Sequence, residues 1–274
     1  MKCWCKQQTT SRAVMGRVGR ISIFAAEGSC AAKAVDTAFM AVERFEQLID
    51  RHNQESALFQ LCSATPGTYL AVPDLLWRLL RLANEMAYRT DGLFDIVAAG
   101  SGGAACWTDI DLSVPREVRL RKPVNMSVGG MAKGFAVDLA VATLKERGIA
   151  AGLVDIGGCI RAFGARPWRI DFNANRRDEE GQADMAVPLI LQNAAFSGLG
   201  QEFGRARLID IRSGRVSSTA EWGPKNMLVR APTCAVADGL AKVAATAPDV
   251  SEKLLAPYGA EAIMLDAAKV SQRP

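Results

Sequence analysis

The chain has 274 residues, 49% of them apolar and 23% charged, which is an ordinary globular composition with enough length for a sizeable core. Its formal charge of +4 is spread thinly, and no block of Lys and Arg alternates with aromatic residues, so nucleic-acid binding is not indicated. No run of about 18 apolar residues occurs, so no membrane span is predicted.

The N-terminus is polar and lacks the apolar centre of a secretory signal. We therefore expect a flexible segment over residues 1–14 and a cytoplasmic protein. The seven cysteines are scattered and odd in number, and no CxxC occurs, which argues against a disulfide framework. Cys3 and Cys5 are expected to be exposed thiols, because the single histidine, His52, leaves a zinc site without enough ligands.

The first part of the chain predicts one strand and two helices. Residues 17–26 alternate between apolar and polar, which is typical of a strand. Residues 30–50 carry apolar side chains at helical spacing with charges on the opposite face. Pro73 and Asp74 then begin a helix that runs to about Tyr88, since proline and an acidic residue both suit a first helical turn.

The middle of the chain predicts a loop, short strands and a third helix. Residues 99–106 are rich in small residues and indicate a loop, and prolines break residues 107–126 into short strands. The stretch 127–138, SVGGMAKGFAVD, begins a helix that is predicted to end near Arg147, with Gly148 as its C-cap.

The last part of the chain predicts mainly strands, followed by helix 234–247 and a helix–strand unit to about residue 265. The polar segment 173–184 is expected to be the loop of a hairpin. The predicted strands are 153–156, 168–172, 186–191, 194–197, 206–210 and 226–230. Strands and helices do not alternate strictly and no linker divides the chain, so we expect a single α+β domain with mixed or antiparallel sheets flanked by helices.

The stretch 127–138 places two glycines and Lys133 at a helix start. A helix N-terminus presents unpaired N–H groups and the positive end of the helix dipole, which together with a lysine suit a phosphate. A tight strand-to-helix turn with a solvated lysine explains the same residues. The stretch matches neither the dinucleotide-binding GxGxxG pattern nor the P-loop.

Asp238 and Lys242 are four residues apart on a predicted helix and therefore share a face. They form either a surface ion pair or a carboxylate and an ammonium directed into a polyphosphate site. A hydrolase is not indicated, because the chain has no GxSxG motif and only His52 for a triad. We expect His52 to be a packing or stacking residue at a helix end.

In chain order, these segments resemble the family of FAD:protein FMN transferases of the ApbE type. The stretch 127–138 matches the family pattern DLGGIAKGYAVD at most positions, and residues 91–95, DGLFD, are similar to DGAFDP. Partial matches to further family motifs lie at Met15–Gly16, His52–Ser56, Asp155–Gly164, Asn193–Gly198, Arg207–Gly214 and Ala237–Ala241. The resemblance implies an ApbE-like domain over residues 15–265, followed by a tail at 266–274.

The resemblance also implies an enzyme that binds FAD and a divalent cation, usually Mg²⁺. Such an enzyme transfers FMN to a Ser or Thr hydroxyl of an acceptor flavoprotein and releases AMP, which is phosphoryl transfer. Asp238 and Lys242 are then the implied catalytic residues, and Gly130, Asp238 and Ala241 the implied metal site. The implied flavin-nucleotide contacts are Met15, His52, Leu93, Phe94, Asp95, Ser127, Lys133, Arg207 and Leu208.

The chain departs from the family patterns at several positions, among them Ala57 in place of the Glu of an SE pair and Ile211 in place of a proline. Ser127 replaces an aspartate, Arg207 a histidine, and Lys242 a threonine that helps to hold Mg²⁺. A protonated lysine has no lone pair for a metal, but its charge can bind a phosphate instead. Two interpretations follow. In the first, the protein is a transferase in which Lys242 and Arg207 bind the phosphates partly in place of the metal. In the second, it is a flavin-nucleotide-binding protein that has lost transfer.

Overall fold

The structure is a computed structural model. It describes residues 6–25, 30–97, 105–173, 186–199, 207–210, 215–218, 227–248 and 251–264. Several segments named above lie outside the described residues: Cys3, Cys5, most of the loop at 99–106, most of the polar segment 173–184, and the tail at 266–274.

The centre of the fold is a seven-stranded sheet in the order β1-β2-β6-β7-β10-β13-β14. Neighbouring strands pair antiparallel throughout. The strands are β1 (Lys6–Val14), β2 (Arg17–Ala25), β6 (Gly152–Ile156), β7 (Cys159–Phe163), β10 (Ala195–Leu199), β13 (Met227–Ala231) and β14 (Glu261–Met264). The sheet thus joins residues from both ends of the described chain.

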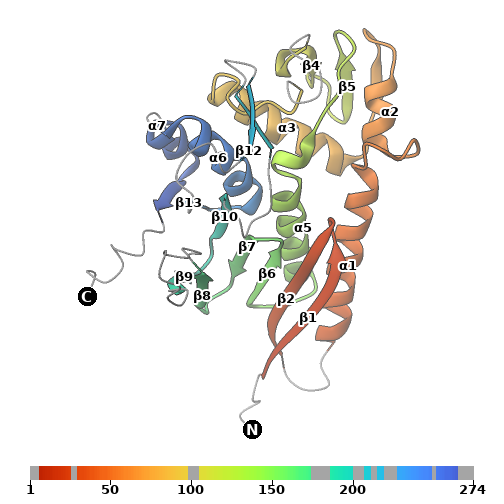
Figure 1. Cartoon of the computed structure of the whole chain (residues 1–274). Coiled ribbons are helices and arrows are strands. Elements are labelled where there is room, and N and C mark those ends of the chain that lie inside the picture. Colours follow the sequence, from red (N-terminus) through yellow and green to blue (C-terminus); the bar gives the residue numbers. More distant parts are fainter. Residues whose placement is uncertain are drawn as a thin grey trace.

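Helices cover one face of this sheet (Figure 1). The helix α5 (Ala132–Glu146) lies against β6 and β7, α6 (Cys234–Thr246) lies against β10 and β13, and the two helices pack on each other. Next to α5 lies α1 (Ala31–Leu48). The remaining helices are α2 (Ala57–Ser63), α3 (Asp74–Arg89), α7 (Ser251–Leu255) and the 3-10 turns η1 (Trp107–Asp109), η2 (Val128–Gly130) and η4 (Ala256–Tyr258).

The opposite face of the sheet is covered by the antiparallel pair β8 (Trp168–Asn173) and β9 (Ala186–Leu191). Strand β7 shows how the two faces divide. Its Cys159 and Phe163 belong to the large core beneath the helices, whereas Ile160 and Ala162 belong to a smaller core with Trp168. This alternation is the period-2 pattern of a strand that is buried on both faces.

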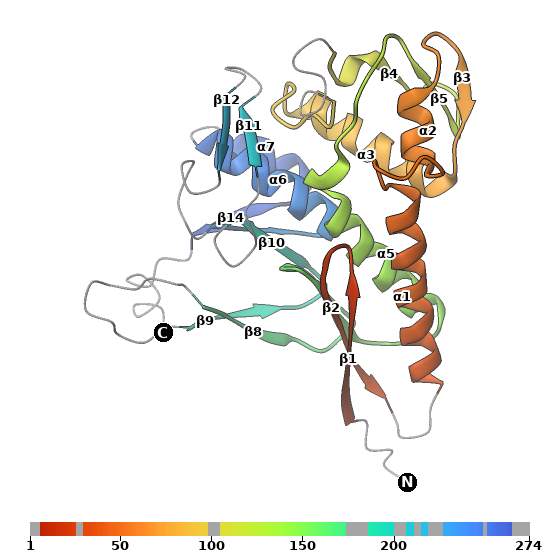
Figure 2. The same ribbon diagram turned by 45° about the vertical axis from the view of Figure 1, so that its right-hand side comes forward.

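A small sheet of β3 (Tyr69–Ala71), β5 (Glu117–Leu120) and β4 (Ile110–Asp111) lies beyond the main sheet, beside α2 and α3 (Figure 2). A separate pair consists of β11 (Arg207–Asp210) and β12 (Arg215–Ser218). The predicted α+β class is confirmed. Within the described ranges, no helix combines the length and apolar character that a bilayer crossing requires.

The prediction of a flexible N-terminus is wrong for residues 6–14. These residues form β1, which pairs with β2 over its whole length. Met15 and Gly16 connect the two strands with φ angles of 54° and 65°. Positive φ at both central residues is the mark of a type I′ hairpin turn, whose twist matches that of the paired strands.

Candidate functional site

A pocket of about 520 Å³ lies where the β1–β2 turn, the end of α1, the loop after it and the start of α5 meet. Four of the residues predicted to contact a flavin nucleotide line it: Met15, His52, Ser127 and Lys133. They come from separate segments of the chain, so the fold, rather than sequence proximity, brings them together.

A carboxylate of α1 fixes the β1–β2 turn at this pocket. The backbone N–H of Met15 donates to Glu46 Oε2 at 2.7 Å, and both residues line the pocket. The left-handed conformation of Met15 costs about 1–2 kcal/mol for a residue with a side chain. The hydrogen bond to Glu46 helps to offset this strain and holds Met15 at the pocket wall.

The charges in the pocket favour an anionic ligand. Arg17, Arg51 and Lys133 line it, and none of the three makes an ion pair with a described residue. The carboxylates that line the pocket are engaged by backbone N–H groups, Glu46 by that of Met15 and Asp50 by that of His52. Three cations against two carboxylates give the pocket lining a net positive charge.

The N-terminus of α5 is partly closed by the protein itself, which corrects the expectation of N–H groups open to a ligand. The N–H of Gly134 donates to Asp238 Oδ2 at 3.0 Å. Asp238 belongs to α6 and is 1% exposed. Its carboxylate satisfies a first-turn donor of α5 and lies at the positive end of that helix, where a negative charge is stabilised.

In turn, a carboxylate of α5 caps the start of α6. Asp138 accepts the N–H groups of Cys234 and Ala235, both at 2.9 Å, and Arg161 from β7 donates to the same carboxylate at 2.6 Å. A Cβ atom at Gly134 would lie 2.2 Å from the carbonyl oxygen of Cys234. This glycine is thus needed for the close approach of α5 and α6, and not for that of a ligand.

The buried Asp238 is in contact with one lysine and feels the charge of a second. The Lys242 ammonium contacts Oδ1 of the carboxylate and also donates to the backbone oxygen of Asp238 at 2.7 Å. The Asp238 carboxylate raises the pKa of Lys133, against the opposing effect of burial. Burial disfavours the charged form of Asp238, but Lys242 and Lys133 together with hydrogen bonds hold its pKa below the usual value. The group is therefore ionised at neutral pH, with two cations beside it.

The carboxyl of Asp138 behaves in the opposite way. Burial raises its pKa, and Arg161 and the two N–H groups of α6 only partly counteract this effect. A neutral acceptor is accordingly better tolerated at Asp138 than at Asp238.

We expect Asp138→Ala to lower the free energy of unfolding by about 3 kcal/mol, because it removes two helix caps and leaves Arg161 without its partner. Asp138→Asn keeps one acceptor oxygen but turns its NH2 group toward the donors at the other position, so it should lose less than Asp138→Ala while still being destabilised. The matched control is Asp171→Ala, which removes the exposed ion pair with Arg169 and should cost at most about 0.5 kcal/mol. Urea unfolding at neutral pH measures all three. Equal midpoints for Asp138→Ala and Asp171→Ala would contradict the capping role.

Other predicted residues lie beside the pocket rather than along its wall. Leu93 and Phe94 are core side chains, and a Cβ atom at Gly130 would lie 3.1 Å from the Phe94 ring. Asp95 accepts the N–H groups of Val97 at 2.7 Å and Trp107 at 3.0 Å, so it braces its own loop. Ala241 is fully buried in the core.

Arg207 and Leu208 begin β11, which lies against α6. Only the backbone of these two residues belongs to the described part of the structure, and their predicted contacts with a nucleotide stay a prediction.

The residues implied for a divalent cation do not fit one. Both oxygens of the Asp238 carboxylate are engaged, Oδ2 by Gly134 N–H and Oδ1 by the Lys242 ammonium. An ammonium group cannot ligate a metal and repels one. In the described ranges, no three His, Cys, Asp or Glu side chains are grouped so that they could hold a metal ion.

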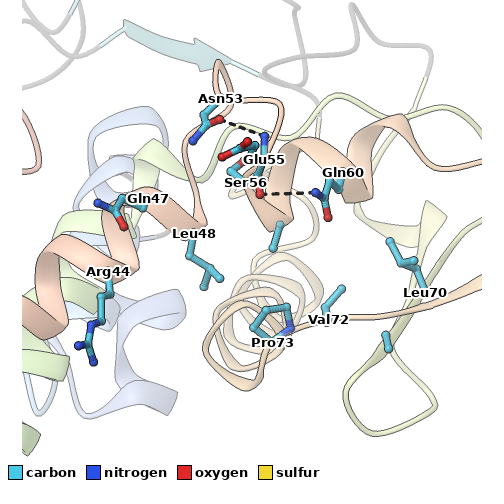
Figure 3. A pocket seen from close by; sticks show the side chains of 12 residues that line it. Arg44, Gln47, Leu48, Asn53, Glu55, Ser56, Gln60, Leu70, Val72 and Pro73 are labelled. Carbon is cyan, nitrogen blue, oxygen red and sulfur yellow. Dashed lines mark hydrogen bonds between the residues drawn. The ribbon is translucent and has the colours of Figure 1, made fainter.

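A second, larger pocket of about 720 Å³ lies on another side of the end of α1 (Figure 3). Its lining includes Asn53, Glu55 and Gln60. The backbone N–H of Glu55 donates to Asn53 Oδ1 at 3.0 Å, and Gln60 Nε2 donates to the backbone oxygen of Glu55 at 3.5 Å. Ser56, the N-cap of α2, also lines it. It contains none of the predicted site residues, so the smaller pocket is the candidate ligand site.

Sequence reasoning missed Arg17 and Glu46 as pocket residues. Arg17 could have been identified, because it directly follows the Met15–Gly16 turn, and its charge is close enough to affect the pKa of Lys133. Glu46 lies among other charges on the polar face of a helix, and nothing in its sequence context marks it.

Known proteins with similar sequences belong to the ApbE family. The sequence pattern of the ApbE family matches residues 15–101 and 102–264. A curated relative, an FAD:protein FMN transferase from Rhodobacter capsulatus, is 31% identical over 38% of this chain. That match spans 25% of the length of the relative.

Solved structures share the fold. The apo flavinyl transferase ApbE of Pseudomonas stutzeri superposes with a TM-score of 0.81 at 19% identity, covering 94% of this chain and 90% of its own. The flavin transferase ApbE of Vibrio cholerae gives 0.80 at 18% identity, over 95% and 93% of the two chains. The ApbE protein of Thermotoga maritima gives 0.77 at 16% identity, over 98% and 100%.

Proposed function

This chain belongs to the ApbE family, and we propose that it is a flavin transferase that moves FMN from FAD to a Ser or Thr hydroxyl of an acceptor protein. The name of the curated relative, FAD:protein FMN transferase, supports this assignment. The observation that carries it is the pocket where Met15, His52, Ser127 and Lys133 meet, next to Asp238.

The charges of the pocket suit the diphosphate of FAD. Asp238 raises and Arg17 lowers the pKa of Lys133, so both a buried carboxylate and a second cation are close enough to act on its charge. An anion bound between Arg17 and Lys133 would relieve their mutual repulsion. His52 and Met15 are on the same wall and offer flat and apolar surface to a flavin or adenine ring.

In the proposed reaction, the acceptor hydroxyl oxygen attacks the phosphorus of the FMN half. A new P–O bond forms, the bond from that phosphorus to the bridging oxygen breaks, and AMP leaves with the bridging oxygen while the hydroxyl proton passes to solvent. Lys133 and Lys242 would hold the diphosphate and stabilise its charge as the bond breaks. We assign no step to a metal ion.

The test has two stages. Titration of the purified chain with FAD, followed by flavin fluorescence, measures binding. Incubation with FAD and a domain that carries a Ser/Thr flavinylation motif, followed by mass spectrometry, then detects the FMN adduct and AMP. Absence of binding at high micromolar FAD would overturn the proposal. Binding without an adduct would instead identify a flavin-nucleotide-binding protein that does not transfer.

Lys133→Met should weaken FAD binding by about 10- to 100-fold, since it removes a charged partner of the diphosphate while keeping the length of the side chain. Lys145→Met serves as the control because Lys145 is an exposed residue near the other end of α5. Fluorescence titration with FAD measures the dissociation constants of the two variants and of the unchanged chain. Equal affinities for all three would exclude Lys133 from the nucleotide site.

A further inference from the structure

The carboxylate of Asp238 already has a cation bound to it. Its Oδ1 contacts the Lys242 ammonium and lies 3.4 Å from the Ser197 hydroxyl, and its Oδ2 accepts the Gly134 N–H. Lys242 also donates to the backbone oxygen of Asp238 at 2.7 Å. A divalent ion could reach this carboxylate only by displacing the ammonium.

The helix holds Lys242 in this place. Asp238 and Lys242 are four residues apart on α6, so their side chains lie one above the other on the same face. The side chain of Lys242 is 18% exposed and that of Asp238 1%, so the pair is shielded from water and salt on most sides. The ammonium is thus a fixed part of the site.

This cation is coupled to the candidate nucleotide pocket through Asp238. The charge of Asp238 acts on Lys242 and also on Lys133, which lines the pocket. Two ammonium charges that act on one carboxylate leave a net positive charge at this end of the pocket. A compact ammonium binds a phosphate as a point charge. It can therefore neutralise phosphate charge in place of a divalent ion.

We propose that Lys242 is a built-in cation of the nucleotide site, so that the chain binds the diphosphate of FAD without a divalent metal ion. This inference rests on the proposed function for the identity of the ligand, but its claim about the metal concerns Asp238 and Lys242 alone.

The first experiment titrates FAD into the chain in excess EDTA and again in excess Mg²⁺. The expected result is the same dissociation constant within about twofold, since no metal enters the site. A gain of about tenfold or more on adding Mg²⁺ would overturn the inference.

Three variants sharpen the test. Lys242→Thr removes the ammonium, leaves space beside Oδ1 and adds a hydroxyl oxygen, so it should lose about tenfold in FAD affinity in EDTA and recover on adding Mg²⁺. Lys242→Arg keeps the charge and should stay independent of metal. Lys253→Thr, at an exposed position of α7, is the control and should not differ from the unchanged chain. Urea unfolding shows whether each variant is folded.

Direct metal binding separates this inference from the proposed function. Mn²⁺ titrated into the chain without FAD and followed by electron paramagnetic resonance should show no bound ion, whereas Lys242→Thr should bind it. Binding of Mn²⁺ to the unchanged chain, lost on Asp238→Asn, would refute the built-in cation. If FAD fails to bind under every condition, the proposed function fails, and the Mn²⁺ titration still decides whether Lys242 excludes a metal.

Discussion

Asp238→Asn is expected to lower the free energy of unfolding by about 3–5 kcal/mol at neutral pH and to reduce FMN transfer by about a hundredfold. The variant keeps the shape of the side chain but leaves Lys133 and Lys242 without their shared counter-charge. It also weakens the acceptor for the Gly134 N–H, which fixes the start of α5. Urea unfolding and the adduct assay measure the two losses separately.

The loss of stability caused by Asp238→Asn should depend on pH. An unfolded aspartate has a pKa of about 3.9. The folded-state pKa of Asp238 lies below its usual value, so the stabilisation by its carboxylate is fully present above pH of about 4 and is lost as the pH falls through the folded-state pKa. The stability difference between the unchanged chain and Asp238→Asn should therefore shrink under acid conditions.

Asp138→Asn is the matched control, because it makes the same chemical change at the other capping carboxylate. At both sites the amide NH2 faces a donor, so this cost is shared, and because burial raises the pKa of Asp138 the loss of charge should cost less there than at Asp238. If Asp138→Asn proves the more destabilising of the two at neutral pH, the assignment of opposite charge environments is wrong.

Gly134→Ala is expected to destabilise the fold by about 3 kcal/mol or more, because overpacking against rigid groups forces backbone shifts. The added Cβ would lie 2.2 Å from the Cys234 carbonyl oxygen and 2.8 Å from the Ala235 Cα. Both are backbone atoms, so α5 and α6 would have to separate. That separation would also lengthen the hydrogen bond from residue 134 to Asp238, and we expect weaker FAD binding in whatever fraction folds.

Gly129→Ala provides the comparison for this second prediction. The nearest atom to a Cβ at Gly129 is Ser127 Oγ at 3.9 Å, which is an ordinary contact. Thermal and urea unfolding of the two alanine variants should differ by several degrees and by a clear shift in midpoint. Similar stabilities would mean that the approach of the two helices does not depend on glycine at 134.

Periodicity predicted the buried elements well and missed the exposed or short ones. The spacing of apolar residues in α1 and α3 is visible in the sequence, because each helix buries one face. Strand β1 was missed because it is a polar edge strand that only its pairing with β2 reveals. Helix α2 has seven residues, too few for a periodic signal.

Four of the predicted contact residues line one pocket, and their roles there stay a prediction. The i,i+4 spacing correctly placed Lys242 beside Asp238, since a helix fixes that relation locally. The N–H groups at the start of the helix in 127–138 were expected to be open to a phosphate, whereas that of Gly134 binds Asp238 and its missing side chain admits α6. No local pattern could show this, because the neighbouring helix is about a hundred residues away in the chain.

The mutual capping of α5 and α6 also constrains when the protein can fold. The bond from Gly134 to Asp238 joins residues 104 apart, and those from Cys234 and Ala235 to Asp138 join residues 96 and 97 apart. Contacts of such long range form late and slowly, because the intervening chain must first be ordered. During synthesis, the cap that Asp238 provides at the start of α5 therefore cannot form until α6 has emerged, and a nascent chain that stops before Cys234 would hold Lys133 on a helix without this cap.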